Sequence, residues 1–259
     1  MKPRPMNSQP MKAMILAAGL GTRLRPLTND RPKALVEVAG RTLLEITIAR
    51  LRAFGVSEVI VNVHHFADMV VDYLAKNNNF GMRIEISRED VLLDTGGGLK
   101  KAAWFFLEDF GRADEPFILH NVDVISTIDL NSMMQFHKAR EALATLAVQA
   151  RETSRYLLFD EHLRLAGRLS GKSGQAEFVR PSRQLEIQAL AFSGIHVISP
   201  RLFSMMTEDG AFSIITSYMR LAGQEENILA FRADQYSWRD LGRPESIALT
   251  EKDLQDKVL

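Results

Sequence analysis

The stretch LAAGLGTRLRPLTNDRPKAL, residues 16–35, joins an apolar run to a glycine turn and then to Arg23, Arg25, Arg31 and Lys33. The run that leads into it, residues 12–18, is short, apolar and ends at glycine, as a buried strand does. A glycine turn that leaves the first strand of an α/β sheet presents backbone N–H groups to an anion, and the missing Cβ lets a phosphate approach closely. The stretch therefore predicts a strand followed by a phosphate loop.

Strand-like and helix-like segments alternate after this loop. Residues 57–65, 83–87 and 116–124 repeat the buried-strand pattern. The segments 41–55, 67–77 and 98–110 have helical spacing. Alternation of this kind predicts an α/β fold with a Rossmann-like, mostly parallel central sheet flanked by helices.

The second half of the chain has a different pattern. After a helix at 131–141 and a strand at 144–150, shorter strand-like pieces surround turn signals at 170–175. Strands at 187–199 and 228–233 enclose a helix at 213–223, and residues 237–255 end helically. These patterns predict a mixed or antiparallel half with no C-terminal β-helix, because the hexapeptide period is absent. We expect a disordered leader at 1–10 and one domain, 11–259, with halves 11–130 and 131–259.

Composition narrows the classes of partner. The 32 basic and 32 acidic residues cancel, which argues against nucleic acid or an anionic membrane surface as a partner. No run approaches the roughly 18 apolar residues of a membrane span, and the first ten residues lack the apolar core of a signal peptide. Without cysteine there are no disulfides and no thiolate chemistry. We expect a cytoplasmic protein that is a monomer or a small homo-oligomer.

Two kinds of ligand are compatible with a glycine turn. A dinucleotide fingerprint needs a third glycine and an acidic residue at the end of the second strand, but this chain has Leu24 and the sequence VHH there. A Walker sequence is absent too. The cations after the turn fit a triphosphate, whose leaving pyrophosphate gains negative charge during reaction. Arg23 can bind phosphate through two N–H groups, and Lys33 supplies a mobile charge.

The whole stretch resembles the signature G-x-G-T-R-L-x-P-L-T-x-x-x-P-K of sugar-1-phosphate nucleotidylyltransferases. The resemblance implies an enzyme that joins a nucleoside triphosphate to a sugar 1-phosphate and releases pyrophosphate. It implies catalytic roles for Arg23, Lys33 and Asp123. It also implies nucleotide binding by Ala17, Ala18, Gly19, Gly21, Thr22, Arg23, Lys33, Gly96 and Gly97.

Two aspartates are candidates for a metal site. Asp123, in LHNVDV, follows the fourth strand, where ligands bind in open α/β sheets, and Asp240 lies in WRDLG. Hard cations prefer such oxygen ligands. The resemblance implies that both aspartates hold Mg²⁺ and that Asn121 contacts the substrate. The family has glycine where this chain has Val122, which raises a nucleotide-sugar-binding regulatory protein without turnover as an alternative.

The base and the sugar are less constrained. The resemblance implies that backbone groups near Gly96, Gly97 and Gly98 meet the base, at a loop that opens a helix. It places Ser193 and Gly194 on the sugar side, and we add Arg155 as a further phosphate contact.

The chain is most similar to short family members without a β-helix, so we expect UTP and N-acetylmuramate 1-phosphate in cell-wall nucleotide-sugar synthesis. Mannose- or heptose-1-phosphate guanylyltransferases are the rivals. A nicotinamide-dependent oxidoreductase is motivated only by the glycine turn.

Overall fold

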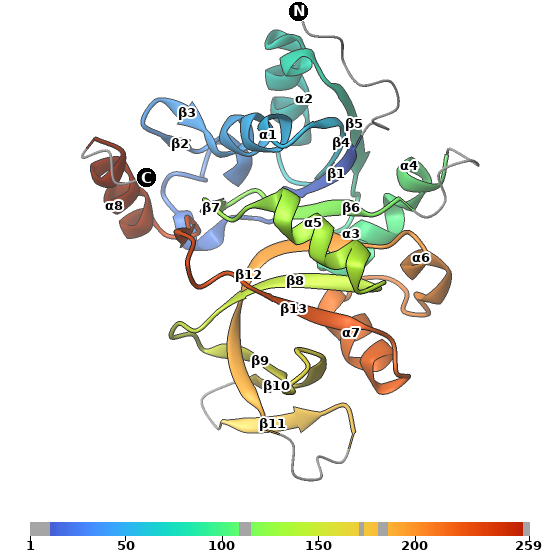
Figure 1. Cartoon of the computed structure of the whole chain (residues 1–259). Coiled ribbons are helices and arrows are strands. Elements are labelled where there is room, and N and C mark those ends of the chain that lie inside the picture. Colours follow the sequence, from blue (N-terminus) through green and yellow to red (C-terminus); the bar gives the residue numbers. More distant parts are fainter. Residues whose placement is uncertain (1–10, 109–114, 171–173, 181–185, 256–259) are drawn as a thin grey trace, which may run out of the picture.

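A computed structural model describes residues 11–108, 115–170, 174–180 and 186–255. Within these residues one ten-stranded mixed sheet runs through the molecule (Figure 1). The predicted leader at 1–10 lies outside the described residues. No helix in the described part of the chain is long and apolar enough to cross a membrane.

The first half supplies the parallel part of the sheet. Strand β1 pairs in parallel with β4 on one side and β6 on the other, and β4 pairs in parallel with β5. These strands are β1 (Met11–Leu16), β4 (Val56–Val63), β5 (Arg83–Arg88) and β6 (Phe117–Asn121). The carboxyl ends of β1 and β6 therefore open at the same edge, where the glycine turn and Asp123 follow them.

The second half is mostly antiparallel. Strand β12 pairs antiparallel with β6, β8 and β9, and β10 pairs antiparallel with β9 and β11. Only β13 and β8 pair in parallel here among the described strands. The strands are β8 (Ala144–Gln149), β9 (Arg155–Phe159), β10 (Leu165–Ser170), β11 (Gln175–Phe178), β12 (Gln188–Ile198) and β13 (Ile228–Arg232). The α/β fold with a mixed second half is thus confirmed.

Two short strand pairs and several short 3₁₀ helices lie outside the main sheet in the described part of the chain. Two-stranded pairs are formed by β2 (Glu37–Val38) with β3 (Arg41–Thr42), and by β7 (Val124–Ser126) with β14 (Trp238–Asp240). Three 3₁₀ helices are η1 (Thr22–Leu24), η2 (Lys33–Leu35) and η3 (Asn78–Gly81).

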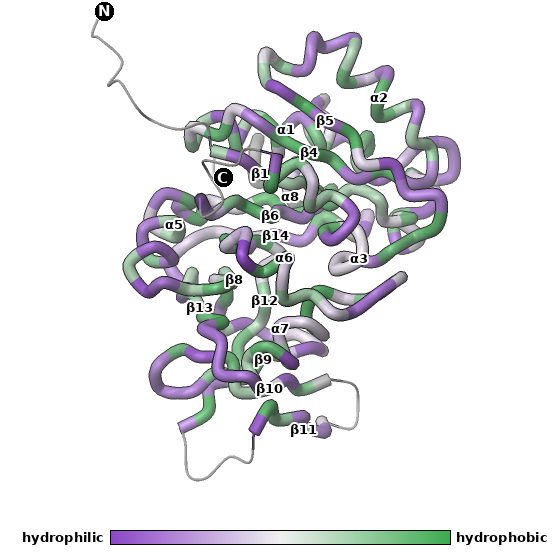
Figure 2. The backbone as a smooth tube through the Cα atoms, turned by 90° about the vertical axis from the view of Figure 1, so that its right-hand side faces the viewer, coloured by the Kyte–Doolittle hydropathy of each residue, from purple (hydrophilic) through white to green (hydrophobic). Residues whose placement is uncertain are grey.

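Helices cover both faces of the sheet, and apolar side chains fill the two layers between. One layer packs α1 (Leu43–Ala53), α2 (Ala67–Lys76) and α5 (Leu130–Ala139). The other packs α3 (Asp94–Lys101), α4 (Ala103–Leu107), α6 (Leu202–Met205) and α7 (Ile214–Gly223). The last helix, α8 (Pro244–Gln255), lies beside β2 (Figure 1). Hydrophobic stretches gather on β4 and β6 in the interior (Figure 2).

Strand β12 carries an irregularity where the two halves meet. Its register with β8 runs from Phe192 opposite Val148 to His196 opposite Leu146, so the residues between them bulge. Gly194 lies in this bulge with a φ of 74°, a backbone conformation that favours glycine. The bulge turns the strand from its pairing with β9 to its pairing with β6.

Candidate active site

The phosphate loop is shaped by its second glycine and anchored by a leucine. Gly21 has a φ of 64°, and a Cβ there would lie 2.9 Å from Thr28 Cγ2 and 3.1 Å from Lys33 Cβ. The Thr28 hydroxyl donates to the Gly21 carbonyl at 2.9 Å. Leu24 is fully buried in the core. Leu24, which stands where a dinucleotide fingerprint would have its third glycine, therefore anchors the loop to the hydrophobic core.

Lys33 forms an ion pair with Asp123. Its ammonium contacts Asp123 Oδ2, and the two side chains are only 14% and 13% exposed. Lys33 begins η2 after Pro32, whereas Asp123 follows β6. The fold thus joins a cation from the phosphate loop to a carboxylate at the end of a neighbouring strand, as the sequence predicted for one common site.

Asp240 reaches the same place from far along the chain. In the β7–β14 ladder Asp240 lies opposite Val124, and the Leu241 N–H donates to the Asp123 carbonyl at 2.8 Å. The Arg23 guanidinium lies 3.7 Å from Asp240 Oδ2. A Cβ on Gly242 would lie 2.5 Å from Arg23 Nη2, so a larger residue there would displace the arginine from this position. The structure brings together all four predicted side chains of this group, Arg23, Lys33, Asp123 and Asp240.

The two aspartates repel each other. Burial raises the pKa of Asp240, and the negative charge of Asp123 raises it further, whereas hydrogen bonding by the Gly242 N–H opposes this shift. A cation between the carboxylates would relieve the repulsion. Mg²⁺ commonly binds one or two carboxylates together with substrate phosphates, and this donor set fits that pattern. Within the described residues no group of three or more acidic, histidine or cysteine side chains offers a denser metal site.

The glycine run lies in a helix rather than in the loop we expected. Gly96, Gly97 and Gly98 belong to α3, and the Gly96 N–H donates to the Phe212 carbonyl at 2.8 Å. Added Cβ atoms would meet Phe212 Cε2 at 2.3 Å from Gly96 and the Gly210 carbonyl oxygen at 2.3 Å from Gly97. The expectation of a loop is wrong: the three glycines are helical, and their lack of side chains lets the 210–212 segment pack directly on the helix backbone.

A buried polar chain links the phosphate loop to this helix, and sequence reasoning missed it. The Ala17 N–H donates to Asn62 Oδ1 at 2.7 Å, and Asn62 Nδ2 donates to Glu89 Oε1 at 2.7 Å. Glu89 Oε2 accepts from the Leu93 N–H at 2.9 Å. Both side chains are almost fully buried. Asn62 interrupts an apolar strand, which is the one signal in the sequence that could have pointed to it.

The bulge of β12 brings the predicted sugar side to the same edge. A Cβ on Gly194 would lie 2.9 Å from Asn121 Nδ2 and from Val124 Cγ2, so the strand passes close to the end of β6. Ser193 is fully buried, and its carbonyl accepts a hydrogen bond from Trp238 Nε1 at 2.7 Å. Asn121, Ser193 and Gly194 therefore lie at one junction, with Ser193 engaged through its backbone.

Val122 replaces the family's glycine without distorting the backbone. Its φ is not positive, its side chain is buried in the core, and its N–H donates to the Leu16 carbonyl at 3.1 Å. The position has no conformation that demands glycine. The substitution therefore gives no structural reason for lost turnover.

Arg155 is not brought to this group by any described contact. It is exposed at the start of β9, opposite Ser170 of β10. A different arginine, Arg151, lies with its guanidinium 3.6 Å from the centre of the Trp238 ring and donates to the Phe192 carbonyl at 2.7 Å. Arg151 and Arg155 are four residues apart, and the sequence alone does not show which of them packs on Trp238.

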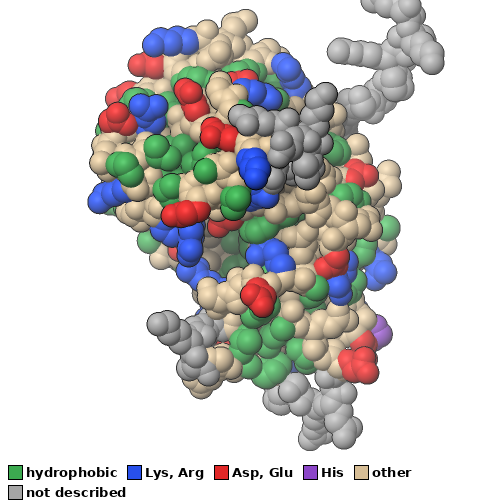
Figure 3. Space-filling view, turned by 90° about the vertical axis from the view of Figure 1, so that its left-hand side faces the viewer, with side chains coloured by type: hydrophobic (Ala, Val, Ile, Leu, Met, Phe, Trp, Pro, Cys, Tyr) green, Lys and Arg blue, Asp and Glu red, His purple; other side chains and the backbone are tan. Residues whose placement is uncertain are grey.

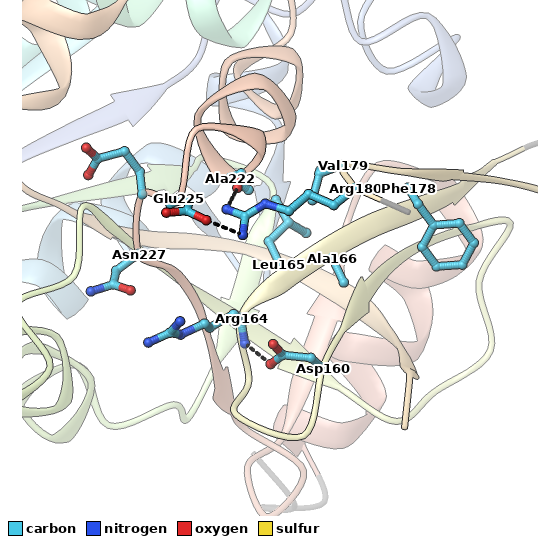
Figure 4. A pocket seen from close by; sticks show the side chains of 11 residues that line it. Asp160, Arg164, Leu165, Ala166, Phe178, Val179, Arg180, Ala222, Glu225 and Asn227 are labelled. Atoms are coloured by element: carbon cyan, nitrogen blue, oxygen red, sulfur yellow. Dashed lines mark hydrogen bonds and ion pairs between the residues drawn. The ribbon is translucent and has the colours of Figure 1, made fainter. Parts of the chain in front are cut away.

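A hollow between the two halves is visible on the face that carries the phosphate loop and α8, with Lys and Arg side chains at its rim (Figure 3). A separate cavity of about 320 Å³ lies in the second half, between β10, the end of α7 and Arg180 (Figure 4). In that cavity Arg180 is already paired with Glu225 and the Ala222 carbonyl. It holds none of the predicted site residues.

Comparison with known proteins identifies the family of the chain. Residues 12–257 match the family model described as nucleotidyl transferase. N-acetylmuramate alpha-1-phosphate uridylyltransferase of Caulobacter vibrioides is 34% identical over 97% of this chain and all of its own length. Mannose-1-phosphate guanyltransferase of Yarrowia lipolytica is 29% identical over 90% of this chain, which spans only 61% of that protein.

Solved structures show the same fold. HddC from Yersinia pseudotuberculosis, complexed with GMP-PN, superposes with a TM-score of 0.71 at 22% identity, covering 94% of this chain and 99% of its own. UDP-glucose pyrophosphorylase from Acinetobacter baumanii gives 0.75 at 18% identity, covering 94% and 92%. The chain belongs to the nucleotidyl transferase family and is a sugar-1-phosphate nucleotidylyltransferase.

Proposed function

We propose that the enzyme transfers the uridylyl group of UTP to N-acetylmuramate 1-phosphate, giving the UDP-sugar and pyrophosphate, with Mg²⁺ and in the cytoplasm. The first choice of substrates rests on the uridylyltransferase relative, which matches over its full length, whereas the mannose guanyltransferase extends beyond this chain. The observation that carries the chemistry is the grouping of Arg23, Lys33, Asp123 and Asp240 at the edge where β1 and β6 end.

Each side chain has a defined task in this proposal. A phosphate oxygen of the sugar 1-phosphate attacks the α-phosphorus in line, and the bond from that phosphorus to the bridging oxygen of pyrophosphate breaks. Arg23, on the exposed side of the loop, holds the leaving phosphates through two N–H groups. Lys33 neutralises charge near the reacting phosphorus. A Mg²⁺ ion held by Asp123 and Asp240 would neutralise further phosphate charge.

The Lys33–Asp123 ion pair also explains how a largely buried ammonium group is stabilised before any phosphate binds. Without a ligand, Asp123 compensates the ammonium. When phosphates arrive, they offer Lys33 a second set of anionic partners, and Asp123 becomes available to a cation. The same two residues therefore serve the free and the loaded enzyme.

The rival substrates are GTP with mannose or heptose 1-phosphate. The decisive experiment is a pyrophosphate-release panel that crosses UTP, GTP, CTP and dTTP with N-acetylmuramate, N-acetylglucosamine, mannose, heptose and glucose 1-phosphates. We expect the highest kcat/KM for UTP with N-acetylmuramate 1-phosphate. A clear preference for GTP and mannose or heptose 1-phosphate would replace this proposal with its rival. No turnover in any pair would revive the regulatory alternative.

A further inference from the structure

Arg151 lies directly after β8 in a rigid setting. The adjoining Ala150 N–H donates to Asp234 Oδ1 at 2.6 Å. Gln149 Nε2 donates to the carbonyls of Ala233 and Tyr236 at 2.9 and 2.8 Å. These bonds tie the end of β8 to the segment that leads into Trp238. The backbone segments that carry Arg151 and Trp238 are thus held together by hydrogen bonds next to both residues.

The guanidinium of Arg151 is poorly compensated. One N–H group donates to the Phe192 carbonyl and the planar face stacks on Trp238, but Nε is buried and has no hydrogen-bond acceptor. Across the described residues no carboxylate forms an ion pair with it, whereas the buried Lys12 pairs with Glu58 and Glu108, and Lys33 pairs with Asp123. Burial lowers the pKa of Arg151, and the charge of Asp240 opposes this shift without forming an ion pair with the guanidinium. A half-buried cation with spare donors is costly unless a ligand supplies the missing anion.

The distance from the reacting group limits what that anion can be. Trp238 and Asp240 are two residues apart on β14, so their side chains lie on one face about 7 Å from each other. No ion pair joins Arg151 to Asp240 in the described part of the chain. The guanidinium over Trp238 is therefore near enough to interact with the charge of Asp240 but lies beside, not within, the group of carboxylates that we assign to the reacting phosphates. A group on the far side of the sugar fits this position better than the phosphate itself.

We propose that Arg151 binds a carboxylate carried by the sugar ring of the substrate, and so selects an acidic sugar 1-phosphate over a neutral one. This inference rests on the proposed function, because N-acetylmuramate carries a lactyl carboxylate and N-acetylglucosamine does not. A guanidinium already held flat by an indole ring presents its remaining N–H groups in a fixed fork, the geometry that a carboxylate accepts. Trp238 positions the arginine and also holds the bulge of β12 through Ser193.

The test compares two substrates in matched variants. For Arg151→Met, we expect kcat/KM with N-acetylmuramate 1-phosphate to fall by about 10- to 100-fold, mainly through KM, the loss expected for a charged hydrogen bond. With N-acetylglucosamine 1-phosphate we expect less than about a threefold change. Arg151→Lys keeps the charge but not the fork, and is expected to lie between. Arg168→Met removes a half-exposed arginine of β10 that is paired with Glu177, and serves as the control.

The outcomes separate this inference from the proposed function. Equal losses with both sugars would overturn it in favour of a phosphate contact or a structural role, and no loss with either would overturn it outright. Both results leave the uridylyltransferase proposal standing if the wild type still turns over N-acetylmuramate 1-phosphate. A wild type that accepts only neutral sugars would overturn both. If Arg151→Met does not fold, the Arg151→Lys pair of kcat/KM values gives the same comparison.

Discussion

At the scale of single residues, the two aspartates are alike in the proposed chemistry but opposite in their effect on the fold. Asp123 is held by Lys33, and that pair is largely buried. Asp240 is more exposed and carries a raised pKa because of burial and of Asp123. Asp123 therefore stabilises the fold through its ion pair, whereas Asp240 is repelled by the negative charge of Asp123.

This difference predicts divergent stabilities for two variants with the same loss of activity. Asp123→Asn and Asp240→Asn should each lower pyrophosphate release by at least about 100-fold, since both remove charge that the transition state needs. Asp123→Asn should also cost about 3 kcal/mol of unfolding free energy, because Lys33 loses its counter-charge. Asp240→Asn keeps the acceptor for the Gly242 N–H and should leave Tm equal or higher. Parallel assays of turnover and thermal unfolding check both, and full activity in either variant would reject the metal assignment.

At the scale of elements, the buried chain from Ala17 through Asn62 and Glu89 to Leu93 fixes three elements relative to one another. It joins the end of β1, the end of β4 and the start of α3. Every donor and acceptor direction in it is determined, because the backbone N–H groups at both ends can only donate. Glu89 must therefore accept with both of its oxygens, a requirement that an amide cannot meet.

Glu89→Gln should consequently destabilise the protein by about 2–3 kcal/mol, although it only replaces one carboxylate oxygen by an NH₂ group. Its NH₂ group would face either the Leu93 N–H or Asn62 Nδ2, and one buried donor would be left unpaired. We expect a raised KM for UTP as well, since the phosphate loop and α3 lose their common anchor. Glu85→Gln, at a half-exposed position on β5, should change the stability by less than about 0.5 kcal/mol. Chemical denaturation of both variants measures this, and equal midpoints would contradict the role given to Glu89.

At the scale of the whole molecule, three histidines are buried in the sheet and its helices. Burial lowers the pKa of His120 and His137 to about 4, and that of His196 to about 3. In the unfolded chain they titrate near their ordinary value of about 6.5. Between these values the unfolded chain binds protons that the folded protein does not, so acid favours unfolding.

The free energy of unfolding should therefore be greatest above about pH 6.5 and should fall as the pH decreases toward 4. Each histidine contributes a slope of up to about 1.4 kcal/mol per pH unit. Denaturant titrations at half-unit steps of pH between 8 and 4.5 give this slope directly. Replacing the exposed His162 by Asn should leave it unchanged. A stability that stays flat from pH 7 to 5 would show that the histidines are not neutral in the folded protein.

Much of this architecture could be predicted from the sequence, because local patterns determine it. The strands that became β1, β4 and β5 are short apolar runs, and the residues of α1 and α2 have helical spacing, so periodicity alone located them. The grouping of Lys33 with Asp123 followed from the rule that ligands bind at the carboxyl ends of parallel strands.

The remainder depended on contacts between distant segments. The Gly96 N–H finds its acceptor on the distant Phe212, and Arg151 rather than Arg155 stacks on the distant Trp238. The partner of Asn62, Glu89, comes directly after the neighbouring strand β5. No local pattern carries such information, since each pairing is made only when the sheet has formed.

The ladder between β8 and β12 has a consequence for exchange of parts between relatives. Gln149 and Ala191 are direct partners across it, so the chain leaves this ladder after Gln149 and returns to it beside the same residue, after forming β9, β10 and β11 at one end of the same sheet. The excursion between them includes Arg151, β9, β10 and β11, whereas Arg23, Lys33, Asp123 and Asp240 all lie outside it. A chimera spliced at these two adjacent points would move the Arg151 segment into another member of the family and keep the recipient's own triphosphate-binding residues. Because Trp238, Ser193 and Gly194 lie outside the segment, we expect the acceptor preference to move with it only into a recipient that has tryptophan at the position of Trp238.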